Sequence, residues 1–202
     1  SRLLSLAQIQ PGQRVLEIGC GWGSLAIEAA QTLDCHVTGI TLSENQLALA
    51  RERAAAAGVS NRVDFQLCDY REVQGRFDRI VSVEMLEAVG HEFLGTFFRR
   101  CDELLAPSGR FVIQVITVPD QRYDGYRRGC DWIQKHIFPG GLAPSLTALC
   151  QAMTRESRFV VESLDNIGAH YATTLRHWRQ RFDARCNEAE QRGYDARFRR
   201  LW

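Results

Sequence analysis

The chain has 202 residues, of which 25 are basic and 24 acidic, and a formal net charge of +1 at pH 7. This length fits one domain that can bury a full hydrophobic core. The balance of charge excludes the strong positive field that attracts nucleic acid, and no apolar run is long enough to span a membrane.

The first predicted element is a buried strand over Arg14–Ile18 that ends in the motif G-x-G-x-G at residues 19–23. A helical pattern follows at once over Ser24–Leu33. A glycine turn lets the backbone pass close to a ligand, and the helix N-terminus offers free N–H groups. The spacing differs from the G-x-G-x-x-G of dinucleotide enzymes, and Glu17 lies just before it. We predict a nucleotide-type cofactor site here, with a plain strand–turn–helix as the alternative.

Strand and helix patterns alternate through the next hundred residues. Further strands are predicted over His36–Ile40, Val63–Leu67, Asp78–Val83 and Arg110–Val118, and helices over Glu44–Ala57 and Glu92–Leu105. Ser43 and Gln46 are spaced as a capping box for the helix that follows them. Alternating strands and helices predict an α/β fold with a doubly wound, mostly parallel sheet.

The composition changes after Pro119, where Tyr, Arg, Gly and Pro become frequent. One more strand is predicted over Phe159–Leu164, followed by an amphipathic helix from Tyr171. We predict a single domain over residues 1–202, with its core at about 12–118 and 158–165, an insertion at about 119–157 over the sheet's carboxyl edge, and C-terminal helices at about 168–202.

The seven cysteines are scattered and form no C-x-x-C pair, and the five histidines do not cluster at metal-ligand spacing. This pattern argues against a disulfide framework, and no metal site is predicted. A reducing cytoplasm is the natural setting, so we predict a cytoplasmic protein, with peripheral contact at the inner membrane face as an open alternative.

Five blocks of sequence, in order along the chain, resemble one enzyme family. They are VLEIGCGWG at 15–23, GITLSENQ at 39–46, FDRIVSVEMLEAVG at 77–90, IQKHIFPGG at 133–141 and HYATTLRHWRQRF at 170–182. The first block occurs in many methyltransferases that use S-adenosylmethionine, whereas IFPGG and HYATTL are far more specific. The chain resembles the cyclopropane-fatty-acid synthase and mycolic-acid cyclopropane synthase family. The resemblance implies a class I methyltransferase fold, which is Rossmann-like, with a helical lipid-binding insertion.

The resemblance implies a binding site for S-adenosyl-L-methionine at the carboxyl edge of the sheet. Glu17 is expected to reach the ammonium of the methionine part, and Thr41 with Gln46 the ribose. Tyr70 is expected to stack on the adenine. Gln46 can instead serve the capping box alone, and Tyr70 can be a half-buried loop aromatic. The full set is Glu17, Gly19, Cys20, Gly21, Thr41, Leu42, Gln46, Asp69, Tyr70 and Arg71.

The implied reaction is methyl transfer to the cis double bond of an unsaturated fatty acyl chain, esterified in phospholipid, which leaves a carbocation. Tyr171 is the leading candidate to stabilise that cation with its ring face. A base must then remove a proton so that a cyclopropane ring can close. By resemblance the base is a bound bicarbonate, which Glu87, Ile116 and Tyr171 are expected to hold.

The chain departs from the family pattern at Gln114 and Ala88, where histidines are usual. Glutamine can hydrogen-bond a carbonate oxygen but cannot carry a proton, so Gln114 leaves cyclopropane and methyl- or methylene-branched products both open. A relative acting on another alkene or small molecule, or a non-catalytic cofactor- or lipid-binding relative, is the alternative.

The chain begins about a dozen residues before the first strand, and is expected to be a piece of a longer enzyme that lacks N- and C-terminal parts. Arginines in the last helices suit a membrane surface, although the interspersed acidic residues are equally typical of a solvated helix face. The expected partner is therefore an unsaturated acyl lipid, and the sequence does not reveal an oligomeric state.

Overall fold

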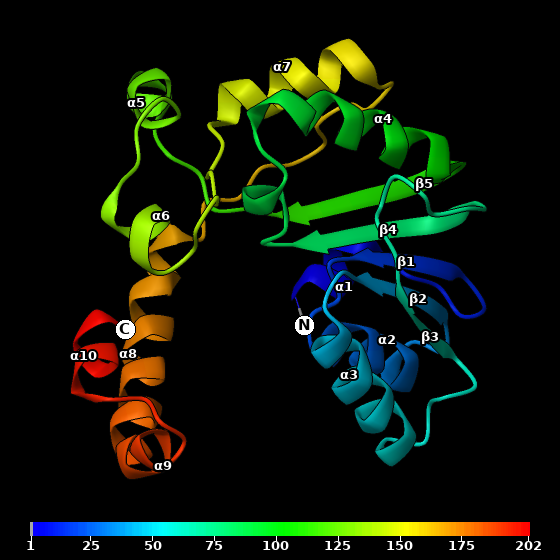
Figure 1. The fold of residues 1–202 in the computed structure, drawn as a ribbon. Helices are drawn as coiled ribbons and strands as arrows, with labels where there is room; N and C mark the ends of the chain where they lie inside the picture. Colours follow the sequence, from blue (N-terminus) through cyan, green and yellow to red (C-terminus); the bar gives the residue numbers. More distant parts are fainter. Residues whose placement is uncertain (1) are drawn as a thin grey trace. The chain divides into compact units, whose positions relative to one another are not determined.

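The computed structural model describes residues 2–202 and contains one sheet that is parallel throughout (Figure 1). Its strands are β1 (Arg14–Ile18), β2 (His36–Thr41), β3 (Val63–Leu67), β4 (Phe77–Val83) and β5 (Leu105–Gln114), in the order β3-β2-β1-β4-β5. The order reverses between β1 and β4. In such sheets ligands bind beyond the carboxyl ends of the strands at the point of reversal. The predicted doubly wound α/β sheet is confirmed.

Where the sequence predicts a helix (24–33, 44–57, 92–105 and from 171), the structure has one to within a few residues, and residues 2–202 form ten helices in all. They are α1 (Arg2–Ala7), α2 (Ser24–Thr32), α3 (Glu44–Ala56), α4 (Leu94–Leu104), α5 (Asp120–Tyr126), α6 (Trp132–His136), α7 (Leu146–Glu156), α8 (Gly168–Ala184), α9 (Cys186–Gln191) and α10 (Ala196–Leu201), with short 3-10 turns η1 (Leu86–Ala88) and η2 (His91–Phe93). The hydroxyl of Ser43 accepts a hydrogen bond from the N–H of Gln46 and caps α3, as predicted, but the second bond of a capping box does not form, because the N–H of Ser43 donates to the Thr41 hydroxyl.

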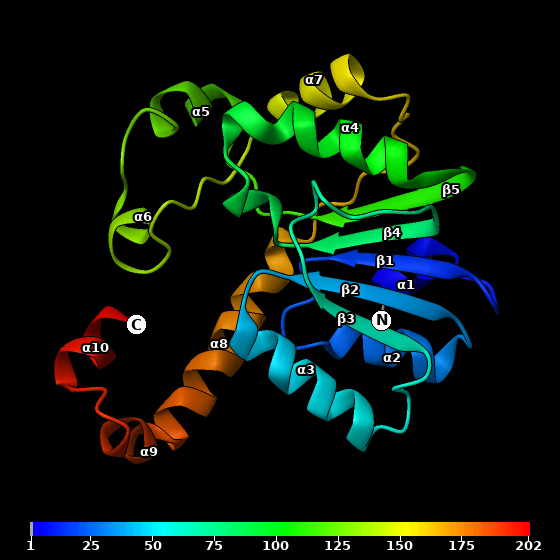
Figure 2. The same cartoon turned by 45° about the vertical axis from the view of Figure 1, so that its right-hand side comes forward.

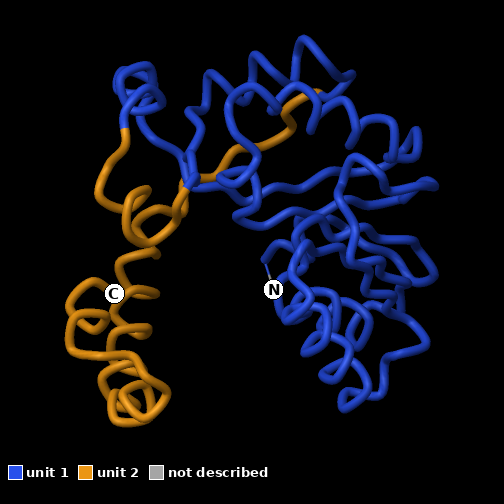
Figure 3. Tube along the Cα trace, viewed as in Figure 1, with its two compact units in different colours: residues 1–129, 140–159 blue, residues 130–139, 160–202 orange. Residues whose placement is uncertain are grey.

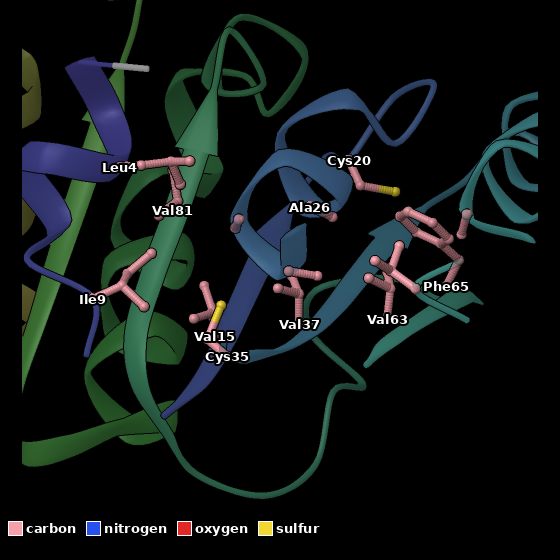
Figure 4. Packing of buried hydrophobic residues seen from close by; sticks show 14 of the residues in the cluster. Leu4, Ile9, Val15, Cys20, Ala26, Cys35, Val37, Val63, Phe65 and Val81 are labelled. Atoms are coloured by element: carbon pink, nitrogen blue, oxygen red, sulfur yellow. The ribbon is translucent and has the colours of Figure 1, made fainter. Parts of the chain in front are cut away.

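The sheet separates two hydrophobic cores because alternate strand residues point to opposite faces. Val15 packs among residues of α1, α2 and α3, whereas Leu16 packs among residues of α4 and α7. Figure 4 shows the first core, and Figure 2 shows the helices on the two faces. Phe97 and Phe98 of α4 are fully buried in the second core, and each contributes roughly 1.5–3 kcal/mol by leaving water.

The predicted strand over Phe159–Leu164 is wrong. This segment forms no strand, and the side chain of Val160 is 84% exposed. An extended segment becomes a strand only when a neighbouring strand pairs with it, and within residues 2–202 β5 pairs with β4 alone. The last strand of the sheet also differs from its prediction. It starts earlier, at Leu105, through a register shift against β4, and ends at Gln114 instead of Val118.

The chain divides into two compact units, coloured separately in Figure 3. The first contains residues 1–129 and 140–159, and the second contains residues 130–139 and 160–202. The predicted insertion is therefore divided: α5 and α7 belong to the first unit, where α7 packs on α4, and α6 belongs to the second. The single-domain organisation stays a prediction.

The second unit is built from α6 and the three C-terminal helices. Within it the ring of Phe198 stacks on Trp202 at 6.1 Å, and Tyr171 meets Trp178 edge to face at 6.1 Å. Across the described part of the chain, each helix is too short or too polar to cross a membrane.

Candidate cofactor and active site

The loop after β1 contains three glycines with left-handed backbones, at φ values of 81° for Gly19, 52° for Gly21 and 82° for Gly23. Glycine reaches such angles without steric cost. A Cβ at Gly19 would lie 2.8 Å from Cγ of Met85, so close packing requires a glycine there. A Cβ at Gly21 would meet nothing within 4 Å. The loop therefore has open space in front of Gly21, where a ligand can approach the backbone.

Glu17, the fourth residue of β1, is a buried carboxylate with only 4% of its surface exposed. Its Oε2 atom is buried and has no hydrogen-bond partner among the described residues. Burial raises the pKa of Glu17 to about 8, although a hydrogen bond with the backbone of Ala26 opposes the shift. A buried carboxylate is stable in its charged form only beside a cation or strong donors. Glu17 is therefore suited to bind a cationic ligand group.

Cys20 and Leu42, both predicted to contact the cofactor, differ in exposure. Cys20 is buried, and burial together with the charge of Glu17 raises the pKa of its thiol to about 12. The thiol stays protonated near pH 7, so it is not a nucleophile. Leu42, after β2, is 73% exposed and offers an apolar surface beside Thr41.

Thr41 and Gln46 form a hydrogen-bonded pair beyond the end of β2. The Thr41 hydroxyl donates to Oε1 of Gln46 at 2.9 Å and accepts from the N–H of Ser43 at 3.2 Å. The Gln46 side chain therefore bonds Thr41, while its backbone N–H is capped by Ser43. This arrangement directs the amide NH2 of Gln46 to donate to a ligand such as a sugar hydroxyl. Contact with a ribose stays a prediction.

Asp69, Tyr70 and Arg71 follow β3. The Arg71 guanidinium donates to both carboxylate oxygens of Asp69, at 2.9 and 2.6 Å, and these bonds lower the pKa of Asp69. The Tyr70 ring is half-buried and meets Phe97 of α4 edge to face at 5.4 Å. Tyr70 is thus held in place by a contact with α4. Stacking on adenine stays a prediction.

The structure brings Glu87 and Ile116 together at the ends of β4 and β5. Oε1 of Glu87, in η1, accepts a hydrogen bond from the backbone N–H of Ile116 at 2.6 Å. Burial raises the pKa of Glu87, and its Oε2 is buried without a hydrogen-bond partner in residues 2–202. The backbone carbonyl of Glu87 also accepts a hydrogen bond from the N–H of Leu142. This bond links η1 to the segment before α7.

Gln114 bonds a residue that the sequence did not single out. Its amide nitrogen donates to Oε1 of Glu84 at 3.0 Å. Glu84 precedes Glu87 by three residues in the same sequence block, but its left-handed backbone has no local signal in the sequence. Tyr171, the remaining predicted residue, belongs to the second unit, and its catalytic role stays a prediction.

The model of the mycolic acid cyclopropane synthetase family matches residues 1–202. The chain belongs to this family. It is 45% identical over 201 residues to tuberculostearic acid methyltransferase UfaA1 of Mycobacterium tuberculosis, covering 100% of this chain and 47% of that protein. It is 41% identical over 197 residues to the cyclopropane-fatty-acyl-phospholipid synthase of Escherichia coli, covering 96% and 48%. The chain spans about half the length of these curated relatives.

The solved structures agree with this family and with the fold. Mycolic acid cyclopropane synthase CmaA1, complexed with SAH and CTAB, superposes with a TM-score of 0.87 at 28% identity, over 99% of this chain and 74% of that one. A geranyl diphosphate methyltransferase in complex with SAM superposes over 80% of this chain and 64% of that one, with a TM-score of 0.69 at 24% identity, a likeness of fold alone. The fold is the class I methyltransferase fold.

Proposed function

We propose that the full-length protein transfers the methyl group of S-adenosyl-L-methionine to the cis double bond of an unsaturated acyl chain in phospholipid. The observation that carries this proposal is the unpartnered buried oxygen of Glu17 beside the open glycine loop. The charged form of a carboxylate in that position needs a cation, and the methionine part of the cofactor has an ammonium group. Family membership and the lipid-modifying relatives support the acyl substrate.

The residues divide the work of binding among three turns. Glu17 would hold the ammonium, Thr41 with Gln46 the ribose hydroxyls, and Tyr70 the adenine ring. Asp69 accepts a hydrogen bond from Arg71, and this pair stabilises the turn that contains Tyr70. When bound, the cofactor supplies an electrophilic methyl group on a sulfonium. The protein contributes by holding this methyl in line with the alkene and away from water.

The residues after β4 and β5 would face the acyl chain. Glu87 is linked to the segment after β5 through its hydrogen bond with the backbone of Ile116. Methyl transfer leaves a cation on the acyl chain, and an aromatic face such as that of Tyr171 stabilises a cation without reacting with it. Proton loss from the new methyl group then closes a cyclopropane, or gives a methylene branch if a hydride has first shifted onto the cationic carbon.

Two measurements test this function. Calorimetry on the 202-residue chain should detect binding of S-adenosylmethionine and of its demethylated product, and tighter binding of a nicotinamide dinucleotide would overturn the cofactor assignment. Lipid mass spectrometry of cells that express the full-length gene, fed methyl-labelled methionine, should show label in unsaturated acyl chains of phospholipid. Label in another alkene or small molecule would identify a different substrate, and no label would indicate a non-catalytic relative.

The proposed lipid substrate also implies a cytoplasmic enzyme that contacts the inner membrane face. Arginines on α8 support such contact, although Arg179 is paired with Asp183 at 3.6 Å. Sedimentation of the full-length protein with vesicles of anionic phospholipid, but not with vesicles of neutral phospholipid, is the expected result. Equal sedimentation with both kinds of vesicle would contradict a role of these arginines in membrane contact.

A further inference from the structure

Glu84, the residue directly after β4, is held in a strained conformation. Its φ of 49° is left-handed, as are those of two other non-glycine residues within the described part of the chain, Gln8 and Asp34. Such a backbone persists only where surrounding contacts stabilise it, and these positions cluster at functional sites. Two hydrogen bonds hold Glu84: its N–H donates to the carbonyl of Gln114 at 2.8 Å, and its Oε1 accepts from Nε2 of Gln114 at 3.0 Å.

Glu84 adjoins both halves of the candidate site. The next residue, Met85, packs against Gly19 of the cofactor loop. On the other side lies Glu87, whose pKa is raised mainly by burial and further by the negative charge of Glu84. The side chain of Glu84 is exposed, whereas the carboxylate of Glu87 is partly buried. Glu84 is therefore an accessible carboxylate at the edge where cofactor and substrate are expected to meet.

A bound bicarbonate fits this edge poorly. By the family resemblance it would accept hydrogen bonds from the backbone beside Ile116 and from the side chain at position 114. In this structure the N–H of Ile116 donates to Glu87 at 2.6 Å, and the amide of Gln114 donates to Glu84. Carboxylates of the protein already accept from the N–H of Ile116 and from one of the two N–H groups of the Gln114 amide. A third anion placed there would meet two carboxylates, and like charges at such short range repel.

We propose that the carboxylate of Glu84, oriented by the amide of Gln114, is the proton acceptor of this enzyme and acts in place of a bound bicarbonate. The inference rests on the proposed methyl transfer to an acyl double bond. Gln114 is suited to this role because an amide can orient a carboxylate without taking its proton. The glutamine that departs from the family pattern thus has a partner that explains it.

The proton balance of the step is complete. The alkene electron pair forms a bond to the methyl carbon as the carbon–sulfur bond breaks, which leaves a cation on the neighbouring carbon. Glu84 then takes a proton from the new methyl group, and the electron pair of that C–H bond closes a cyclopropane ring. If a hydride first shifts from the methyl-bearing carbon to the cationic carbon, the same proton loss gives a methylene branch on the acyl chain. Neither route needs a reductant, and Glu84 returns its proton to water.

The test uses the full-length protein, labelled S-adenosylmethionine and vesicles of phospholipid with cis-monounsaturated chains, in buffer freed of carbon dioxide. Wild type should methylate lipid in this buffer, and added bicarbonate should not raise the rate. Glu84→Gln should lose roughly 10²-fold or more of turnover while it binds S-adenosylmethionine with unchanged affinity, because only the base is removed.

Glu84→Gly separates the lost base from a folding defect. Glycine accepts the φ of 49°, so this variant should be at least as stable as wild type. Its turnover should fall like that of Glu84→Gln, and added formate or bicarbonate should restore part of it by filling the vacated space. Gln8→Gly is the matched control, since it makes the same backbone change before β1 and should keep wild-type turnover.

The outcomes separate this proposal from the proposed function. Wild-type turnover that requires bicarbonate, or wild-type turnover in Glu84→Gln, would overturn the role of Glu84 while methyl transfer stands. A wild-type protein that binds S-adenosylmethionine yet methylates no lipid, with or without bicarbonate, would overturn the proposed function itself.

Discussion

At the scale of single residues, Glu17 combines a proposed binding role with a cost to stability. Its pKa is about 8 in the folded protein against 4.5 for an ordinary glutamate. Between these pH values the folded state keeps a proton that the unfolded state has lost, so the stability of the ligand-free protein falls as the pH rises through this range. The cofactor's ammonium would offset that cost by pairing with the carboxylate.

Glu17→Gln is therefore expected to stabilise the ligand-free protein at pH 8, by on the order of a few kcal/mol, and to have little effect near pH 4.5. The same variant should lose most of its affinity for S-adenosylmethionine. Denaturant unfolding at both pH values and calorimetry measure the two effects. Glu52→Gln on the exposed side of α3 is the control and should change neither. Equal effects of Glu17→Gln at both pH values would contradict the buried, proton-bearing carboxylate.

Gly21 offers a sharper probe of the cofactor loop than Gly19. A side chain at Gly19 would strike Met85, so its replacement disturbs packing and binding together. A Cβ at Gly21 enters open space, as does one at Gly58 after α3, and both glycines have positive φ. Alanine should cost about 1–2 kcal/mol of stability at either site. Only Gly21→Ala should weaken S-adenosylmethionine binding, by about tenfold or more; equal affinities in the two variants would place the ligand elsewhere.

At the scale of elements, α4 positions part of the proposed adenine site. Phe97 contacts the ring of Tyr70, whereas its neighbour Phe98 contacts Phe111 of β5. Leucine at either phenylalanine should destabilise the fold by about 1–2 kcal/mol. Phe97→Leu alone should also weaken cofactor binding, because Tyr70 loses the ring that orients it. Thermal unfolding and calorimetry on both variants test this, and a similar loss of affinity in Phe98→Leu would show that the effect is general loosening.

The same scale explains what could be predicted from the sequence. Apolar runs before turn residues were enough to place β1 and β3 with the bounds that the structure shows. The run at Phe159–Leu164 has the same composition, but a strand also needs a neighbour, and pairing is not a local property. Glu84 was missed for a related reason. Its left-handed backbone depends on pairing with Gln114 of β5, thirty residues away in the chain.

The motif residues around the glycine loop and after β4 were predictable because their chemistry is local to the motif. The family resemblance supplied Glu87 and Ile116 as members of one site, and the structure places them in direct contact. It also assigned both to a bicarbonate, whereas here they bond each other. Which donor bonds which acceptor depends on the distances between the ends of β4 and β5. These distances cannot be read from the spacing of residues in the sequence.

At the scale of the whole molecule, cofactor binding and turnover are expected to separate between the two units. The proposed cofactor residues all belong to the first unit, and Tyr171 belongs to the second. Tyr171 lies on α8, where its ring contacts Trp178. By the resemblance it serves the cation on the acyl chain and not the cofactor. A change at Tyr171 should therefore affect the reaction rate and leave the affinity for S-adenosylmethionine unchanged.

In the full-length protein, Tyr171→Ala should lower turnover by about ten- to thirtyfold, the effect of losing a desolvated cation–π contact of about 1.4–2 kcal/mol. Tyr171→Phe keeps the ring face and should retain most of the rate. Single-turnover transfer of labelled methyl to lipid, together with calorimetry, measures both properties, and Tyr194→Ala removes another aromatic of the second unit as the control. If Tyr171→Phe is as slow as Tyr171→Ala, the hydroxyl and not the ring face is the active group. If Tyr171→Ala loses cofactor affinity in step with turnover, the division of labour between the units is wrong.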